Sequence, residues 1–153
     1  MRYVAGSHAH HQAQCVFCDL PAQADDTATY ILRRGRSAYV IMNLYPYNNG
    51  HLMVVPYTHE ARLPALDAAV VHEMMDLTRE CQRVVQDAMH PQGFNLGMNQ
   101  GSAAGAGIEE HLHLHLVPRW IGDTNFMPAV ANTRVMPQHL DETYALLRKG
   151  FDV

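Results

Sequence analysis

Apolar residues along the chain recur with two spacings, one typical of strands and one typical of helices. Short apolar runs predict strands at residues 30–33 and 37–42, around a turn at Gly35, and at residues 51–56, 94–99 and 112–117. Apolar residues at every third or fourth position predict a long helix over residues 67–89 and a final helix over residues 138–149. Cys81 lies on the apolar stripe of the long helix, so we expect it to pack in the core.

The order of these elements, with strands on both sides of one long helix, is typical of an α+β domain with an antiparallel sheet. A chain of 153 residues has the length of one domain and is short for two, and its 48% apolar composition is enough for a packed core. Residues 1–14 have no hydrophobic period, and we expect them to form a mobile N-terminal arm ahead of a single domain at residues 15–153.

Composition and charge exclude several classes of protein. No apolar run approaches the roughly 18 residues that a membrane-spanning helix needs, and the N-terminal residues lack the apolar segment of a secretory signal. The formal net charge of −4 argues against a nucleic-acid-binding protein. Three cysteines are too few and odd in number for a disulfide scaffold, so a reducing cytoplasm is the predicted compartment.

The strongest chemical signal is a run of alternating histidines. His111, His113 and His115 alternate with leucines, and a strand points alternate residues to opposite faces. The three imidazoles should therefore share one face, while the leucines enter the core. Such a face would be costly as mere packing, because each ring needs hydrogen-bond partners. Two interpretations remain at this point: the histidines bind a metal, or one of them is a nucleophile whose neighbours set its tautomer and charge.

A loop of small residues precedes the histidines. Residues 99–107 read Asn-Gln-Gly-Ser-Ala-Ala-Gly-Ala-Gly, and such a loop lets backbone N–H groups approach an anion closely. Directly before the histidine strand, this loop favours phosphate as the ligand. An imidazole that attacks phosphorus forms a phosphoramidate and divides one difficult displacement into two easier steps.

These motifs resemble those of the histidine triad (HIT) nucleotide-binding proteins. The run from His111 to Val117 is similar to the family's alternating histidine motif, and Gly50-His51 followed by an apolar strand that ends in Pro56 is similar to its second element. The resemblance covers about residues 15–119. Within the family, the segment at residues 43–51 and the segment after Val117 look most like the bacterial diadenosine tetraphosphate phosphorylase branch.

The resemblance implies a HIT fold, with a five-stranded antiparallel sheet and helices on one side, and a homodimer whose sheets join. It also implies an enzyme that binds a nucleotide or a dinucleoside polyphosphate and cleaves it through a covalent nucleotidyl-histidine. Carried over by position, His113 is the nucleophile, His115 and His51 orient it and hold its tautomer, and His113 and His115 both touch the substrate. Asn43 takes the place of a ribose contact. The expected α-phosphate cradle consists of Asn99, Gly105, Ala106 and Gly107.

One departure from the family changes the expected reaction. Its hydrolases and phosphoramidases carry Gln and then Ser or Thr before the first histidine, where this chain has Gly107 and Ile108, or Ala106 if the loop is one residue longer. No side-chain amide is then available to place a water molecule, so transfer to inorganic phosphate is favoured over hydrolysis. The alternatives are a hydrolase of nucleotide conjugates, a nucleotide-binding module with vestigial catalysis, and a histidine-rich metal carrier, which the alternating leucines disfavour.

The pair Cys15-x-x-Cys18 raises the question of a metal. By spacing it is half of a zinc site, and it is equally compatible with two packing or surface cysteines. The resemblance completes the pair, because some bacterial members of the family add a histidine after the Gly-His strand and the first histidine of the triad. His59 and His111 match these positions, which implies a structural Cys₂His₂ zinc site. Four protein ligands leave no open position, so we expect the metal to take no part in the chemistry.

Overall fold

A computed structural model describes residues 15–123 and 140–152 of the chain. The expected arm at residues 1–14 and the first two residues of the predicted final helix lie outside this part. The elements follow one another as α2 (Val16–Ala22), α3 (Asp26–Thr29), β1 (Ile31–Arg34), β2 (Ala38–Met42), β3 (Leu52–Pro56), η1 (Leu63–Ala65), α4 (Ala68–Met89), β4 (Gly93–Met98), η2 (Ser102–Ala104), β5 (Leu114–Arg119) and α6 (Leu140–Phe151).

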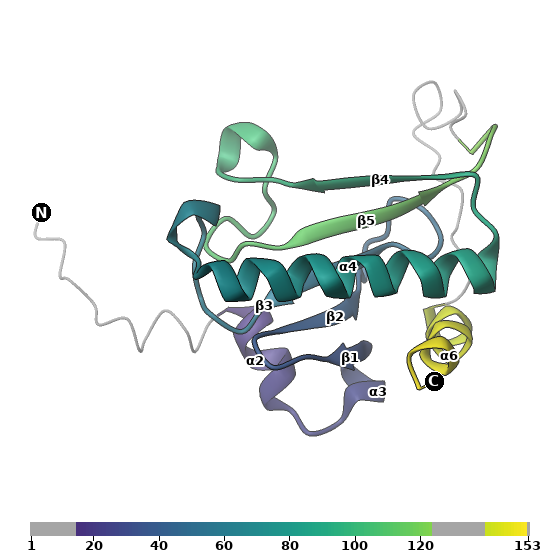
Figure 1. Ribbon diagram of the computed structural model, residues 1–153, viewed down its shortest axis with the longest axis horizontal. Helices are drawn as coiled ribbons and strands as arrows, with labels where there is room; N and C mark the ends of the chain where they lie inside the picture. Colours follow the sequence, from purple (N-terminus) through teal and green to yellow (C-terminus); the bar gives the residue numbers. More distant parts are fainter. Residues whose placement is uncertain (1–14, 124–139, 153) are drawn as a thin grey trace, which may run out of the picture.

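The strands form one antiparallel sheet. Within the described residues it has five strands in the order β1-β2-β3-β5-β4, and every neighbouring pair is antiparallel (Figure 1). Each predicted strand has a counterpart within two residues, and the helix predicted over residues 67–89 is α4, with Asp67 as its N-cap. The α+β class with a five-stranded antiparallel sheet, one long helix and a C-terminal helix is therefore confirmed.

Alternation along the strands divides the side chains between two cores. On one face, α4 and α6 cover strand residues such as Val40 and Leu52, and Cys81 is fully buried there as expected (Figure 1). On the other face, Phe17 of α2 packs with Tyr39 and its neighbours on the strands. The expectation of helices on one side therefore holds for α4 and α6 only, because the apolar residues of α2 are buried against the opposite face.

The strand that carries the histidines begins at Leu114, two residues later than predicted. Both neighbouring strands stop pairing at this residue, because Leu114 is the partner of Met98 in β4 and of Val54 in β3. The N–H group of Leu112 instead donates to the carbonyl oxygen of Glu60 over 2.7 Å. The predicted alternation nevertheless continues through the preceding residues. Leu112 and Leu114 are buried in the core beneath α4, whereas the ring of His113 lies against the α2 side.

Gly50 lies at the end of the β2–β3 connection, two residues before β3 begins. Its φ of +76° lies in the left-handed region that favours glycine. A Cβ atom at this position would lie 2.7 Å from Met89 Sδ and 3.3 Å from Pro118 Cγ. The absence of a side chain therefore lets the connection pass close to the end of α4 and to β5. His51, the next residue, then lies directly before the start of β3.

The sequence pattern predicts neither of the two short helices near the N-terminus. α3 has a recognisable start, because the Asp25 carboxylate accepts hydrogen bonds from the Thr27 and Ala28 N–H groups, both 3.1 Å long. α2 spans 7 residues and contains Pro21, so it is too short to produce a helical period. Among residues 15–123 and 140–152, no helix combines the length and the apolar character needed to cross a membrane.

Candidate active site and metal centre

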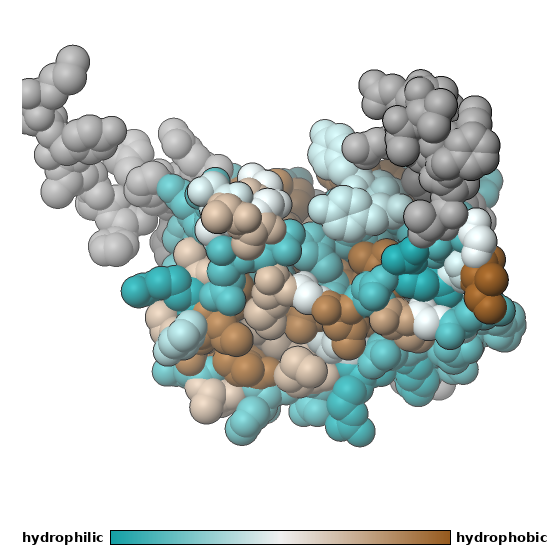
Figure 2. Space-filling model, turned by 90° about the horizontal axis from the view of Figure 1, so that it is seen from above, coloured by the Kyte–Doolittle hydropathy of each residue, from teal (hydrophilic) through white to brown (hydrophobic). Residues whose placement is uncertain are grey.

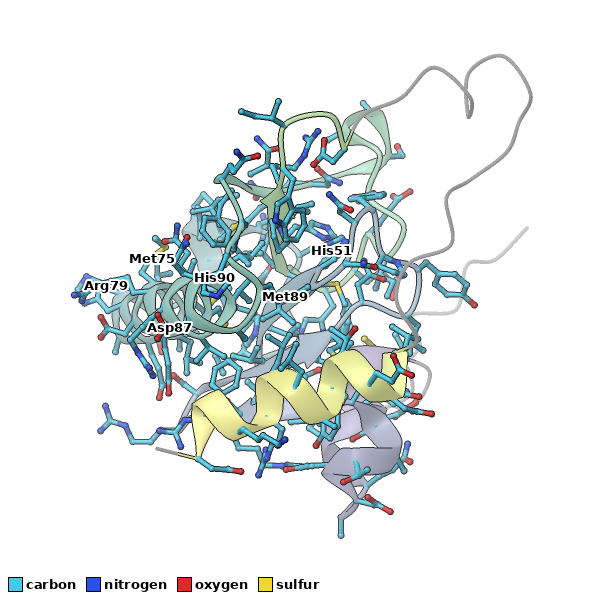
Figure 3. All side chains as sticks on the ribbon, turned by 90° about the vertical axis from the view of Figure 1, so that its right-hand side faces the viewer. His51, Met75, Arg79, Asp87, Met89 and His90 are labelled. Carbon is cyan, nitrogen blue, oxygen red and sulfur yellow. The ribbon has the colours of Figure 1, made fainter. Side chains whose placement is uncertain are left out.

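Two histidines from neighbouring strands form a buried pair. The register of β3 and β5 places Met53 opposite His115, and the Nε2 atom of His51 lies 2.9 Å from the Nδ1 atom of His115. His51 is only 1% exposed. It lies on the side of the sheet away from the outward-pointing side chains of α4, among them Arg79 and Asp87 (Figure 3). The structure thus brings together the two histidines that were expected to orient the third.

Fixed hydrogen-bond donors determine which ring nitrogens of this pair carry a proton. The N–H group of Tyr47 donates to His51 Nδ1 over 3.1 Å, so that nitrogen is unprotonated and His51 carries its proton on Nε2. His51 Nε2–H in turn donates to His115 Nδ1, which leaves the proton of His115 on Nε2. The amide nitrogen of Asn43, 3.5 Å from His51 Nδ1, is a second donor that agrees with this assignment.

His113 adopts the opposite tautomer. Its Nδ1 atom lies 2.8 Å from the carbonyl oxygen of His111, and because a carbonyl oxygen only accepts, Nδ1 must carry the proton. The Nε2 atom of His113 therefore keeps its lone pair. The ring centroids of His113 and His115 are 4.7 Å apart, with the rings inclined at 71°. A ring with an unprotonated Nε2 thus packs beside an imidazole that still has an N–H to donate.

Burial keeps these imidazoles neutral. Desolvation, followed by the neighbouring rings of His115 and His113, lowers the pKa of His51 to about 3. Desolvation, followed by the ring of His113, lowers the pKa of His115 to about 4. Burial also lowers the pKa of His113. At neutral pH the three rings are therefore uncharged, and each has one protonated and one unprotonated nitrogen.

The loop of small residues forms a tight turn whose N–H groups are partly occupied. The turn is made possible by Gly101 and Gly105, with φ values of +81° and +78°. Gly105 N–H donates to Ser102 O over 3.0 Å and Ala106 N–H donates to Gly101 O over 3.4 Å, so two of the expected cradle amides are used inside the loop. Among the described residues, no acceptor binds the Gly107 N–H, which leaves this amide available to a ligand.

The two ends of this loop have different surroundings. Asn99 follows β4 and is half-buried, and its side-chain amide has no hydrogen-bond partner in the described part of the chain. Ile108 is half-buried and packs against the apolar cluster that contains Phe17, whose ring contacts His113. The loop therefore approaches the neighbourhood of His113 through an apolar residue, at one of the positions where related hydrolases are expected to carry a polar side chain.

A second cluster brings two cysteines and two histidines together. The candidate ligand atoms of Cys15, Cys18, His59 and His111 all lie within 4.8 Å of one another. His111 Nδ1 lies 3.3 Å from Cys15 Sγ and 3.6 Å from Cys18 Sγ, and His59 Nδ1 lies 3.4 Å from Cys18 Sγ. The ligands of a tetrahedral zinc ion are separated by roughly 3.3–3.8 Å. These four residues, which are those expected from the sequence, could therefore hold a metal ion.

His111 is oriented for metal binding by the hydrogen bond on its other nitrogen. Its Nε2–H donates to Pro56 O over 2.8 Å, so the lone pair of Nδ1 faces the two sulfur atoms. Metal-binding histidines are usually held by such a second partner. Burial and then the neighbouring Cys15 raise the pKa of the Cys18 thiol to about 11. A cation bound between the sulfurs would favour the thiolate instead.

The sequence pattern assigns no role to two aromatic residues that contact the site. Phe17 packs against His113 with a centroid separation of 4.9 Å, and His113 is only 4% exposed. Tyr47 stacks on His51 at 5.0 Å and 28°, although its own side chain is 70% exposed. The C-x-x-C spacing describes only the cysteines, and the loop that carries Tyr47 has no period. Neither contact has a signal in the sequence.

Comparison with known proteins agrees with this geometry. Residues 25–120 match the HIT domain family. The chain is similar to an AP-4-A phosphorylase from Mycobacterium tuberculosis, with 44% identity over 131 residues that cover 86% of this chain and 67% of the relative.

Solved structures of HIT proteins share the fold. A Zn-bound histidine triad family protein from Mycobacterium smegmatis has a TM-score of 0.73 and 25% identity, over 92% of this chain and 95% of that protein. A hypothetical histidine triad nucleotide-binding protein from Sulfolobus tokodaii also has a TM-score of 0.73, with 23% identity over 90% of this chain and 92% of that protein.

The burial of neutral His51 makes the stability of the fold depend on pH. Below the ordinary histidine pKa of 6.5, the unfolded chain binds a proton at this residue, whereas the folded protein does not until about pH 3. Stability is therefore lost as the pH falls, and His51 should account for about 2 kcal/mol between neutral pH and pH 5. Urea unfolding of wild type and His51→Gln at both pH values measures this contribution. An equal pH dependence in the two proteins would contradict the assignment.

Proposed function

Because the chain belongs to the histidine triad (HIT) family, we propose that it cleaves dinucleoside polyphosphates, such as diadenosine tetraphosphate, at the α-phosphate through a covalent nucleotidyl-His113. The observation that carries this proposal is the tautomer of His113. Its Nδ1–H is bound by the His111 carbonyl, so Nε2 has a free lone pair. The name of the 44% identical relative, AP-4-A phosphorylase, supports this class of substrate.

In the first step, the Nε2 lone pair of His113 attacks the α-phosphorus and forms a P–N bond. The bond from phosphorus to the bridging oxygen breaks, and its electron pair leaves with the second nucleotide, which is ionised at neutral pH and needs no proton. The imidazole ring becomes positively charged, and the Nδ1–H bond to the His111 carbonyl stabilises this charge. His115 Nε2–H can donate a hydrogen bond to the departing oxygen.

The remaining expected site residues bind the substrate in this proposal. The free Gly107 N–H and the unpaired amide of Asn99 are suited to the non-bridging oxygens of the α-phosphate. Gly105 and Ala106 shape the loop, since their own N–H groups are used within it. Asn43 lies beside His51 at the start of the β2–β3 connection, and in this proposal its side chain binds the ribose.

In the second step, an acceptor oxygen attacks phosphorus, the P–N bond breaks and its electron pair returns to His113 Nε2. We propose inorganic phosphate as the acceptor. An ionised phosphate oxygen attacks with its own lone pair, whereas water must lose a proton to a general base. His115 already carries its proton on Nε2, and Gly107 and Ile108 have no polar side chain to hold a water molecule. Phosphate attack on the adenylylated enzyme gives ADP.

We further propose that the Cys15, Cys18, His59 and His111 cluster holds a structural zinc ion. The donor set and the separations of the ligand atoms suit tetrahedral zinc, and a structural neighbour is described as Zn-bound. A bound zinc would connect α2 to the segment that leads into β5. All four positions are then filled by the protein, so the ion contributes to stability and the reaction is left to the imidazoles.

A homodimer with joined sheets is also proposed. β4 lies at one end of the strand order, so its outer edge is free to pair within the described part of the chain. Leu96 in the middle of β4 is 46% exposed, and apolar patches interrupt the polar surface on this side of the molecule (Figure 2). A second copy that adds its own β4 would cover this edge.

Product analysis tests the proposed reaction. Diadenosine tetraphosphate incubated with the protein and inorganic phosphate should give ADP and ATP, and little product should form without phosphate.

His113→Asn should lower turnover by about a thousandfold or more while nucleotide binding persists. His90→Asn, at an exposed position after α4, should behave as wild type.

Other outcomes of this assay would contradict the proposal. AMP and ATP formed regardless of phosphate would identify a hydrolase. Binding without any products would identify a nucleotide-binding module. Wild-type turnover by a clean His113→Asn preparation would exclude the covalent step.

Metal analysis tests the proposed zinc ion. Protein purified without added metal should contain about one zinc per chain, and Cys18→Ser should lose most of it and unfold at lower denaturant concentration. Cys81→Ala is the matched control, because Cys81 is buried on α4 away from the cluster and its replacement should leave the zinc content unchanged. A wild-type protein that is free of metal and equally stable after chelation would contradict the site.

A further inference from the structure

Phe17 stands between the two cysteines of the metal cluster and faces the candidate nucleophile. Its ring packs on His113 with a centroid separation of 4.9 Å and an inclination of 50°. Its ring also meets His111 edge-on, at 5.6 Å and 73°. Phe17 is 3% exposed and His113 is 4% exposed, so solvent has little access to their contact. One side chain therefore touches both a metal-ligand candidate and the imidazole proposed to attack phosphorus.

The position of Phe17 is fixed on both sides. Its carbonyl oxygen accepts a 2.7 Å hydrogen bond from the hydroxyl of Tyr39, which is fully buried on β2. The turn that carries it is closed by the Cys18 N–H, which donates to the Cys15 carbonyl over 2.9 Å. The two sulfur atoms approach His111 at 3.3 and 3.6 Å. A metal ion held by these sulfurs would anchor the Phe17 backbone through the cysteines that precede and follow it.

His113 needs a restraint of this kind. The Nδ1–H bond to the His111 carbonyl fixes one atom of the imidazole, and two rings pack against it, those of His115 at 4.7 Å and Phe17 at 4.9 Å. The Phe17 ring, inclined at 50° to the imidazole, opposes rotation of the imidazole about that hydrogen bond. Two of these three contacts on His113 come from the metal cluster, one through the backbone of His111 and the other through the side chain between the cysteines.

We propose that Phe17 is a positioning residue for His113: the C-x-x-C turn holds its ring against the imidazole, so that the metal cluster fixes the direction of the attacking lone pair. This inference rests on the proposed function, in which His113 Nε2 is the nucleophile. Misplacement of a reacting group by about 1 Å can lower a rate about a hundredfold. Loss of the Phe17 ring should therefore lower kcat by about ten- to a hundredfold and leave KM nearly unchanged, because Phe17 is expected to contact the imidazole and not the substrate.

The test compares Phe17→Leu and Phe17→Ala with Val16→Ala, whose side chain belongs to the same turn and is 42% exposed. Three quantities are measured for each protein: kcat and KM for diadenosine tetraphosphate with phosphate, zinc per chain, and the ¹⁵N spectrum of labelled histidine. The signals of His113 are identified by their loss in His113→Asn. Wild type and Val16→Ala should show a single His113 form with the proton on Nδ1. Phe17→Ala should retain zinc but show a second tautomer or an exchange-broadened His113 signal.

Phe17→Leu keeps much of the apolar volume and guards against a variant that does not fold. It should retain zinc and fall between wild type and Phe17→Ala in kcat and in the His113 spectrum. A single Nδ1–H form together with wild-type kcat in Phe17→Leu and in any folded Phe17→Ala would overturn the proposal. Equal losses in Val16→Ala would also overturn it, since the effect would then belong to the turn as a whole.

The spectrum also separates this inference from the proposed function. If His113→Asn remained active, the proposed function would fail, whereas the tautomer of His113 in the Phe17 variants would still report on the positioning. Cys18→Ser tests the anchor: it should disturb the His113 signal as Phe17→Ala does, and Cys81→Ala should not. An undisturbed His113 signal in Cys18→Ser would overturn the role of the metal cluster.

Discussion

The 2.8 Å hydrogen bond from His113 Nδ1–H to the His111 carbonyl is the constraint on which the site depends. A neutral imidazole has one proton, so an acceptor on one ring nitrogen determines the state of the other. Here the acceptor is a backbone atom of the same chain segment, two residues earlier, and its peptide group is held by the Leu112 N–H, which donates to the Glu60 carbonyl over 2.7 Å. The backbone of the fold thus leaves the Nε2 lone pair of His113 unprotonated, as the proposed attack on phosphorus requires.

Hydrogen bonds also fix the tautomers of His51 and His115, but they place the proton on Nε2 instead of Nδ1. Tyr47 N–H occupies His51 Nδ1, and the chain of donors then places the proton of His115 on Nε2. Because burial lowers the pKa of His51 and of His115, these protons stay where the hydrogen bonds put them at neutral pH. A nitrogen without a proton and a neighbouring N–H therefore coexist, which suits attack on a phosphorus atom and stabilisation of a departing oxygen.

Much of this arrangement could be predicted from local sequence. The alternation of leucine and histidine at residues 111–117 gives the two faces of the strand, and the Cys15, Cys18, His59 and His111 set was expected from the family resemblance. The start of β5 could not be predicted from local sequence, because it depends on where Val54 and Met98 end the pairing of the two neighbouring strands. The contacts of Phe17 with His113 and of Tyr47 with His51 could not be predicted either. Phe17 meets a residue 96 positions away in the sequence, and no spacing rule describes such a contact.

The most direct test of the account is to capture the covalent intermediate. Diadenosine tetraphosphate labelled at the α-phosphate is mixed with the enzyme in the absence of inorganic phosphate, denatured at alkaline pH to preserve a P–N bond, digested and sequenced by mass spectrometry. The account predicts a labelled nucleotidyl group on Nε2 of His113, which disappears when phosphate is added before denaturation. An enzyme that turns over the substrate with no label on His113, or with the label on another residue, would contradict it.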